Sequence, residues 1–154
     1  MKFNMSVSGM DEFRRDMFRY SKTVHDKLQR EVASTATKIH KEASELAPSD
    51  TGGLRQGIQM MVGQLTSLVW SSRKYSVDVE QGRGPTPTTA KELVGWVRRK
   101  LKLRGGHMWA VATIIAKKIT AFGTRAQPFF EPAVSKYKNR FFVNVRRIIM
   151  ETRA

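Results

Sequence analysis

The sequence predicts an α+β fold, with a long N-terminal helix and further helices packed on a small antiparallel β-sheet. Two observations predict it. Apolar residues recur every three or four positions over residues 9–46, which is the spacing of one helix face. Residues 57–81 instead hold short runs separated by turn residues, which is typical of strands. The 154 residues are expected to form a single domain, 1–154, with a modest core.

The predicted first helix, 9–46, is long for such a small domain. Ser8 is expected to cap it, with Asp11 completing a capping box, and Pro48 should end it. Such a helix is roughly 50 Å long. It is therefore expected either to curl around a compact body or to pack part of its apolar stripe on a neighbouring subunit. Residues 1–7 alternate weakly and are expected to form a short strand.

The sheet is expected to be a three-stranded antiparallel meander. The first two strands are Ile58–Val62 and Leu65–Ser71, joined tightly through Gly63 and Gln64. In the third, residues 75–80, apolar and polar side chains alternate, which predicts a half-buried strand. A glycine- and proline-rich loop, 82–87, should follow it.

Three more helices are expected, over about 89–102, 107–122 and 131–151. Thr89 and Glu92 form a capping-box pattern at the start of the first. Gly105 and Gly106 are expected to break the chain before the second. Pro132 suits the first turn of the last helix, where its missing N–H costs nothing.

The charge of the chain is strongly positive and unevenly placed. The formal net charge is +15, of which residues 98–154 carry +12 with fourteen basic and two acidic residues. A field of that sign favours a polyanion or an acidic protein surface as a neighbour. Scattered cations without base-reading groups suit non-specific contact with double-stranded DNA. The candidate DNA- or partner-facing residues are Arg98, Arg99, Lys100, Lys102, Arg104, Lys117, Lys118 and Arg125.

Trp96 and Trp109 flank the basic run from Arg98 to Arg104. The tryptophans could stack on bases while the cations contact phosphates. The alternative is that both tryptophans belong to the core and that the cations form a solvated helix end. The sequence leaves both interpretations open.

No constellation of catalytic residues is found, so the chain is not expected to be an enzyme. His25, His40 and His107 lie far apart, and no phosphate-binding loop or zinc signature is present. Asp78 and Glu80 would share one side of the third strand, where a polar solvent face is a simpler interpretation than a metal or acid–base pair. We expect no catalytic, cofactor-binding or metal site.

Two other features limit the class of protein. The chain has no cysteine, which excludes a disulfide framework and a thiolate metal site. Its longest apolar stretch, Trp109–Ala116, is shorter than the roughly 20 residues that span a bilayer. No contact with a membrane is therefore expected.

Three segments occur in an order that resembles a known family. They are Ala47–Ile58, Tyr75–Gly82 and Gly123–Ala133. The chain resembles the siphophage neck and tail-completion (head–tail joining) family, the gene-product-ten-like tail components of lambdoid coliphages. The matching residues, which suit turns and packing, are Pro48, Thr51, Gly52, Leu54, Arg55, Tyr75, Glu80, Gly82, Pro128, Phe129 and Pro132. Gly57, Arg83 and the very basic stretch 100–106 depart from the family's pattern.

The resemblance implies a structural virion protein at the neck or tail end, assembled in the host cytoplasm. It implies a ring of copies, expected to be a hexamer, that joins head to tail around the DNA passage. Partners would be head-completion or connector proteins, tail-terminator or tail-tube proteins, and double-stranded genomic DNA held non-specifically. The alternatives are a free-standing basic nucleic-acid-binding module, and a tail terminator or minor head protein.

Overall fold

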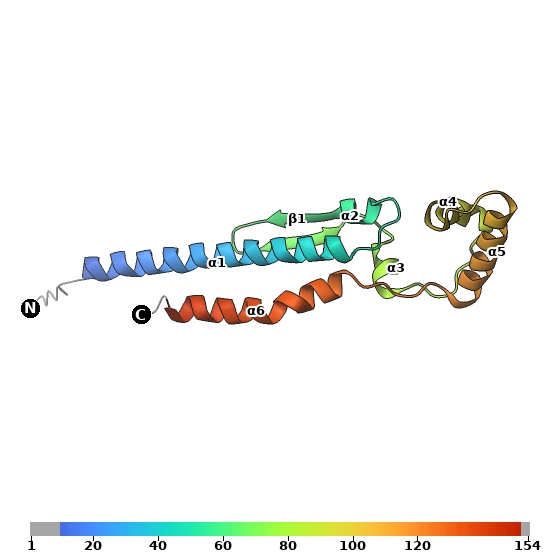
Figure 1. The fold of residues 1–154 in the computed structure, drawn as a ribbon. Coiled ribbons are helices and arrows are strands. Elements are labelled where there is room, and N and C mark those ends of the chain that lie inside the picture. Colours follow the sequence, from blue (N-terminus) through green and yellow to red (C-terminus); the bar gives the residue numbers. More distant parts are fainter. Residues whose placement is uncertain (1–9, 152–154) are drawn as a thin grey trace, which may run out of the picture.

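The computed structural model describes residues 10–151, with side chains from residue 15 onward, and has an elongated shape (Figure 1). The strand expected over residues 1–7 and the cap expected at Ser8 lie outside the described residues. The elements are α1 (Met10–Leu46), α2 (Gly53–Gly57), β1 (Ile58–Val62), β2 (Ser67–Ser71), α3 (Ser76–Gln81), α4 (Ala90–Leu101), α5 (Gly105–Phe122) and α6 (Phe130–Glu151). The α+β class predicted from the sequence is confirmed.

The body of the molecule has three layers, built on α1. The antiparallel β1–β2 hairpin packs on one side of α1, in a register that pairs Ile58 with Ser71 and Val62 with Ser67. The C-terminal helix α6 runs antiparallel to α1 on another side (Figure 1). Helices α4 and α5 pack on each other at the far end, beyond the body. We call these two helices the distal pair.

The core of the body is thin and rich in alanine. Its buried residues are Ala43, Ala47, Leu54, Ile58, Phe129 and Ala133. Small side chains let α1 and α6 approach closely, and Phe129, with none of its surface exposed, fills the space between layers. Phe129, one of the family-motif residues named from the sequence, therefore lies in the core just before α6.

Helix α1 stays extended along the body instead of curling around it (Figure 1). Near the N-terminal end of α1, Met17 of the apolar stripe is exposed, and its neighbour Phe18, outside the stripe, keeps 73% of its surface accessible. The curled alternative is therefore wrong. The other alternative, a stripe shared with a neighbouring subunit, stays a prediction.

The third strand predicted over residues 75–80 is wrong, because this segment forms the short helix α3. The N–H of Val79 donates to the carbonyl of Tyr75 at 3.1 Å, a helical contact. Tyr75 and Val79 thus meet at helical spacing, and Val79 packs on the core while Val77 is exposed. Asp78 and Glu80 do not share a strand face, so the reason for considering them as a pair disappears.

Two boundaries also differ from the sequence expectation. Strand β2 begins at Ser67, because Leu65 and Thr66 belong to a turn in which Gly63 N–H donates to the Thr66 carbonyl at 2.7 Å. Gly105 opens α5 and does not break the chain ahead of it. The segment between α4 and α5 is residues 102–104, where Lys102 adopts a left-handed φ of 53°, and Gly105 opens α5 with a left-handed φ of 59°.

Candidate partner-binding surface

A narrow neck joins the distal pair to the body. It consists of residues 82–89 and 123–129, which run side by side and exchange two hydrogen bonds between Arg83 and Thr124, of 3.1 and 2.7 Å. Gly82 and Gly123 adopt φ values of 78° and 76°. A Cβ on Gly123 would lie 2.0 Å from the carbonyl oxygen of Arg83. Only glycine fits these positions, because side chains would both strain the backbone and separate the two segments.

The N-terminus of α6 is held at the neck by Glu80. Its carboxylate accepts hydrogen bonds from the N–H groups of Phe129, Phe130 and Glu131, at 2.9, 3.0 and 2.8 Å. Burial of Glu80 by itself would raise its pKa, but the three N–H bonds outweigh it, so the pKa lies below its ordinary value. The carboxylate thus satisfies N–H groups that have no partner within the helix.

Two of the eight candidate cations attach α4 to the body. Arg99 binds Asp50 through two contacts, Nε–Oδ1 at 3.2 Å and Nη2–Oδ2 at 2.5 Å, while the Lys100 ammonium donates to the carbonyl of Ser49. The hydrogen bond from Arg99 lowers the pKa of Asp50. Beside these contacts, Trp96 lines a cavity of about 320 Å³ between α4 and the 47–54 turn. Arg99 and Lys100 therefore have a structural role inside the chain.

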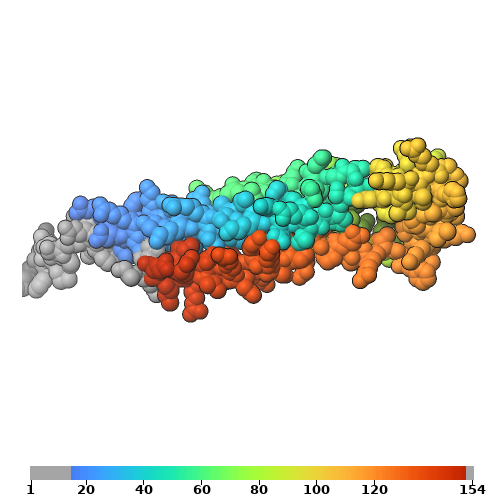
Figure 2. Space-filling view, viewed as in Figure 1, coloured from blue at the N-terminus to red at the C-terminus, as the bar shows by residue number. Residues whose placement is uncertain are grey.

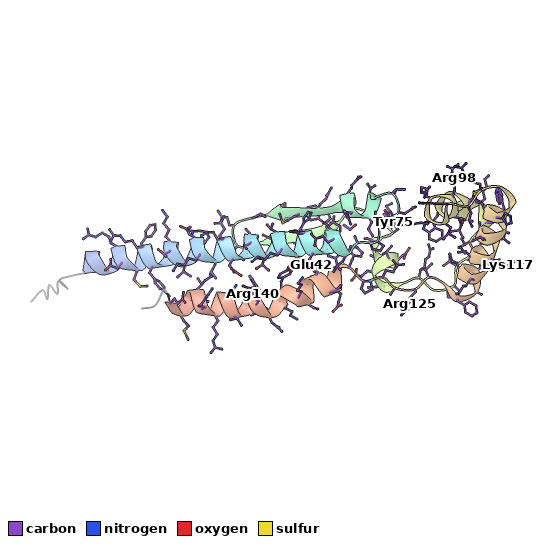
Figure 3. The ribbon with its side chains drawn as sticks, viewed as in Figure 1. Glu42, Tyr75, Arg98, Lys117, Arg125 and Arg140 are labelled. Atoms are coloured by element: carbon purple, nitrogen blue, oxygen red, sulfur yellow. The ribbon has the colours of Figure 1, made fainter. Side chains whose placement is uncertain are left out.

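The other six candidate cations are exposed. Within residues 15–151 no acidic side chain lies within ion-pair distance of Arg98, Lys102, Arg104, Lys117, Lys118 or Arg125. The reason is visible in the sequence, because residues 93–130 contain no Asp or Glu. Arg98 and Lys117 point away from the body, and Arg125 lies on the neck (Figure 3). Trp96 and Trp109 are both partly exposed, so neither is a core residue.

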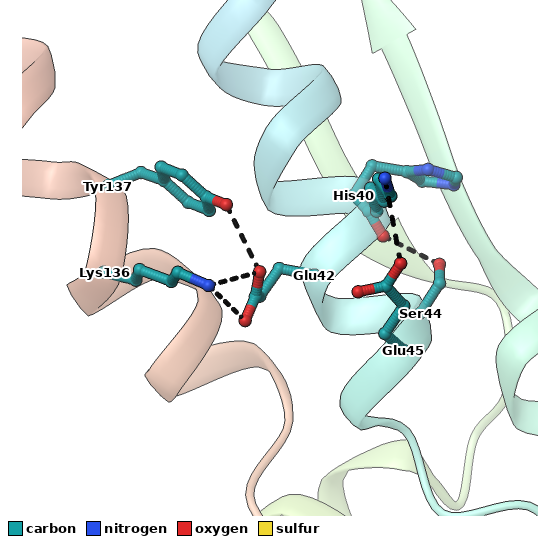
Figure 4. Close-up of polar contacts among 7 residues, drawn as sticks. His40, Glu42, Ser44, Glu45, Lys136 and Tyr137 are labelled. Carbon is teal, nitrogen blue, oxygen red and sulfur yellow. Dashed lines mark hydrogen bonds and ion pairs between the residues drawn. The ribbon is translucent and has the colours of Figure 1, made fainter.

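One cation of the body, in contrast, is paired with an acidic residue of a neighbouring helix. Lys136 of α6 contacts both carboxylate oxygens of Glu42 on α1 at 2.8 Å, and the Tyr137 hydroxyl donates to the same group at 3.2 Å (Figure 4). The hydrogen bond with Lys136 lowers the pKa of Glu42 and raises that of Lys136. His40 connects α1 to β1, because its Nε2 lies 3.1 Å from the Ile58 carbonyl oxygen.

The family-motif residues occupy structural positions. Gly52 precedes α2 with a left-handed φ of 77°, and Leu54 is buried in the core. Arg55 Nε donates to the Ser44 carbonyl at 2.8 Å, which ties α2 to the last turns of α1. Pro132 lies in the first turn of α6, as expected. Sequence reasoning missed what Glu80 and Asp50 contact, because both contacts join segments about 50 residues apart.

The described residues contain no group of three or more His, Asp or Glu side chains that could hold a metal ion. None of the helices in this part of the chain is long and apolar enough to cross a membrane. A thin core with much uncovered apolar and basic surface is typical of a structural protein that works in contact with other macromolecules.

Comparison with known families gives the particular class. A family model described as "Bacteriophage HK97-gp10, putative tail-component" matches residues 11–93, from the start of α1 into α4. The chain belongs to this family of structural phage tail components, whose members are parts of the virion. No curated protein and no solved structure matches the chain. The match contains the first two sequence motifs, whereas the third motif and most of the distal pair follow it.

Proposed function

We propose that this tail component forms a ring at the neck or tail end of the virion, where it joins the head to the tail around the DNA passage. The observation that carries the proposal is the exposed area. The chain exposes 11977 Å², whereas a compact monomer of 17.6 kDa exposes about 7,900 Å². The coloured part of Figure 2 has a long, narrow outline, and such a shape exposes more surface than a compact one of the same mass. Neighbouring subunits would cover the excess.

The uncovered apolar residues support assembly through two different faces. On the outer side of the β1–β2 hairpin, Met61 and Leu68 form a cross-strand pair, and Trp70 lies beside them; all three are exposed. On α6, Val143 and Met150 are exposed one above the other at a spacing of seven residues. Contacts between unlike faces can close into a ring, and six copies would match the symmetry of a tail.

The partners of this ring would be further copies of the chain, head-completion or connector proteins on one side, and tail-terminator or tail-tube proteins on the other. The experiment that tests the proposal is a reconstruction of the phage neck, together with light scattering of the purified protein. A closed ring located between head and tail is the expected result. A monomer at all concentrations, absent from the neck, would contradict it.

A free-standing nucleic-acid-binding module is a second candidate, favoured by the six exposed cations of the distal pair and neck. It predicts tight, salt-dependent binding of the monomer to duplex DNA. A tail terminator or minor head protein is a third candidate, and the same reconstruction separates it from a neck ring by its position.

A further inference from the structure

The outer side of α5 carries apolar side chains as well as cations. Ile114 and Phe122 keep 67% and 79% of their surfaces exposed, among the highest values of the large apolar residues in the described chain. Lys117 and Lys118 are exposed on the same helix, and α5 contains no acidic residue. We call Ile114, Lys117, Lys118 and Phe122 the distal surface.

Helical spacing brings these four side chains together. Lys117 and Lys118 follow Ile114 by three and four residues, so both neighbour it on the helix surface. Phe122 follows Lys118 by four residues and continues the same row. The opposite side of α5, with the buried Ala112 and Ala116, packs on α4. The distal surface therefore mixes positive charge with large apolar groups, and all four of its residues are exposed. Lys117 points away from the body (Figure 3).

The combination of two lysines with two large apolar side chains suits some ligands better than others. Duplex DNA would neutralise the lysines through its phosphates, but it would leave Ile114 and Phe122 facing a highly charged, hydrated backbone. A protein surface with an apolar centre and an acidic rim would bury the apolar pair and also pair the lysines. A second copy of this chain offers no such rim on α1, because basic residues outnumber acidic ones over residues 15–46.

We propose that the distal surface docks on an acidic protein surface with an apolar centre, in a neighbouring component of the virion. This inference rests on the proposed function, since it names the chemistry of one partner of the ring. It also assigns the uncompensated charge of the distal pair to protein recognition and not to the DNA passage. The neck and the Arg99–Asp50 contact would hold the distal surface in position for docking.

Two double variants on α5 separate charge from apolar contact. Ile114→Ser with Phe122→Ser removes apolar area without changing charge, and Lys117→Glu with Lys118→Glu reverses charge without removing the apolar pair. Matched controls on α6 are Phe142→Ser with Ile149→Ser, which the ring proposal does not use, and Lys138→Glu with Arg140→Glu, all at exposed positions. Circular dichroism and light scattering would establish that each variant folds and keeps the oligomeric state of the wild type.

The binding probes are heads and tails purified from phage that lack the gene, tested by co-sedimentation, and a short DNA duplex, tested by fluorescence anisotropy. We expect both α5 variants to bind heads or tails roughly tenfold more weakly, as for central interface residues, with little change in the controls. The serine variant should bind the duplex as the wild type does.

Two results would overturn the inference while leaving the ring intact. One is a serine variant that binds heads and tails as well as the wild type does. The other is duplex DNA that displaces the wild-type protein from the particles, which would make DNA the ligand. A wild-type protein that binds neither heads nor tails would instead overturn the proposed function, and this inference with it.

Discussion

The body and the distal pair balance their charges in different ways. Between α1 and α6, Lys136 forms an ion pair with Glu42. The pair lowers the pKa of Glu42 and raises the pKa of Lys136, so both charged forms are favoured. Over residues 93–130 there is no acid to pair with, and six of eight cations stay exposed without one. The two long helices of the body are therefore joined by an internal ion pair, whereas these six cations of the distal pair and neck make no ion pair with the described residues.

The strongest test of the body is its largest buried side chain. Phe129→Ala should lower the free energy of unfolding by about 3–5 kcal/mol, because it leaves a cavity where the neck enters the core. Urea denaturation would measure the change. Phe142→Ala on the exposed side of α6 is the matched control, and an equal loss there would refute the distinction between covered and uncovered phenylalanines.

The carboxylate of Glu80 links the neck to α6. Glu80→Gln should cost about 1–2 kcal/mol, as for the loss of a charged helix cap. Because the pKa of Glu80 is depressed below its ordinary 4.5, its stabilisation is present above that value and is lost as the pH falls through the lower, folded pKa.

Thermal melts from neutral to acidic pH would test this prediction for Glu80. The stability difference between the wild type and Glu80→Gln should be constant near neutral pH and shrink under acidic conditions. A difference that did not depend on pH would argue against a role for the negative charge.

A third test adds a methyl group at the neck, outside the helices of the body and of the distal pair. Gly123→Ala should cost about 1–3 kcal/mol through backbone strain, and the added Cβ would also push residues 82–89 and 123–129 apart. Limited proteolysis should then cut the neck first and leave α1 and α6 intact. Gly84→Ala is the control, since its Cβ would meet no atom within 4 Å; equal cleavage of both variants would contradict the tight-neck interpretation.

The smallest expected effect is at the contact between α4 and the body. Asp50→Asn should leave the global stability nearly unchanged, because Asp50 and Arg99 are open to solvent and exposed ion pairs contribute little. Hydrogen exchange should nevertheless become faster in α4 relative to α1 and α6. Faster exchange throughout the chain would show that the distal pair and the body unfold as one unit.

Much of this architecture follows from local patterns. The three- and four-residue recurrence of apolar side chains predicted α1, and the Thr89–Glu92 pattern predicted the start of α4, where the Thr89 N–H donates to Glu92 at 3.2 Å. The error at residues 75–80 has a physical cause. Alternation over six residues is compatible with a short helix when one face contacts the core and Glu80 must reach the N–H groups at the start of α6.

By itself the sequence determined the four long helices, the β1–β2 hairpin and the absence of acidic residues between 93 and 130, because each depends on residues close together in the chain. Only the tertiary structure decided which cations are used internally and which face outward. Arg99 and Arg98 are adjacent in sequence, yet Arg99 binds Asp50 whereas Arg98 points away from the body. That choice depends on how the neck places α4 against the 47–54 turn, which no local pattern encodes.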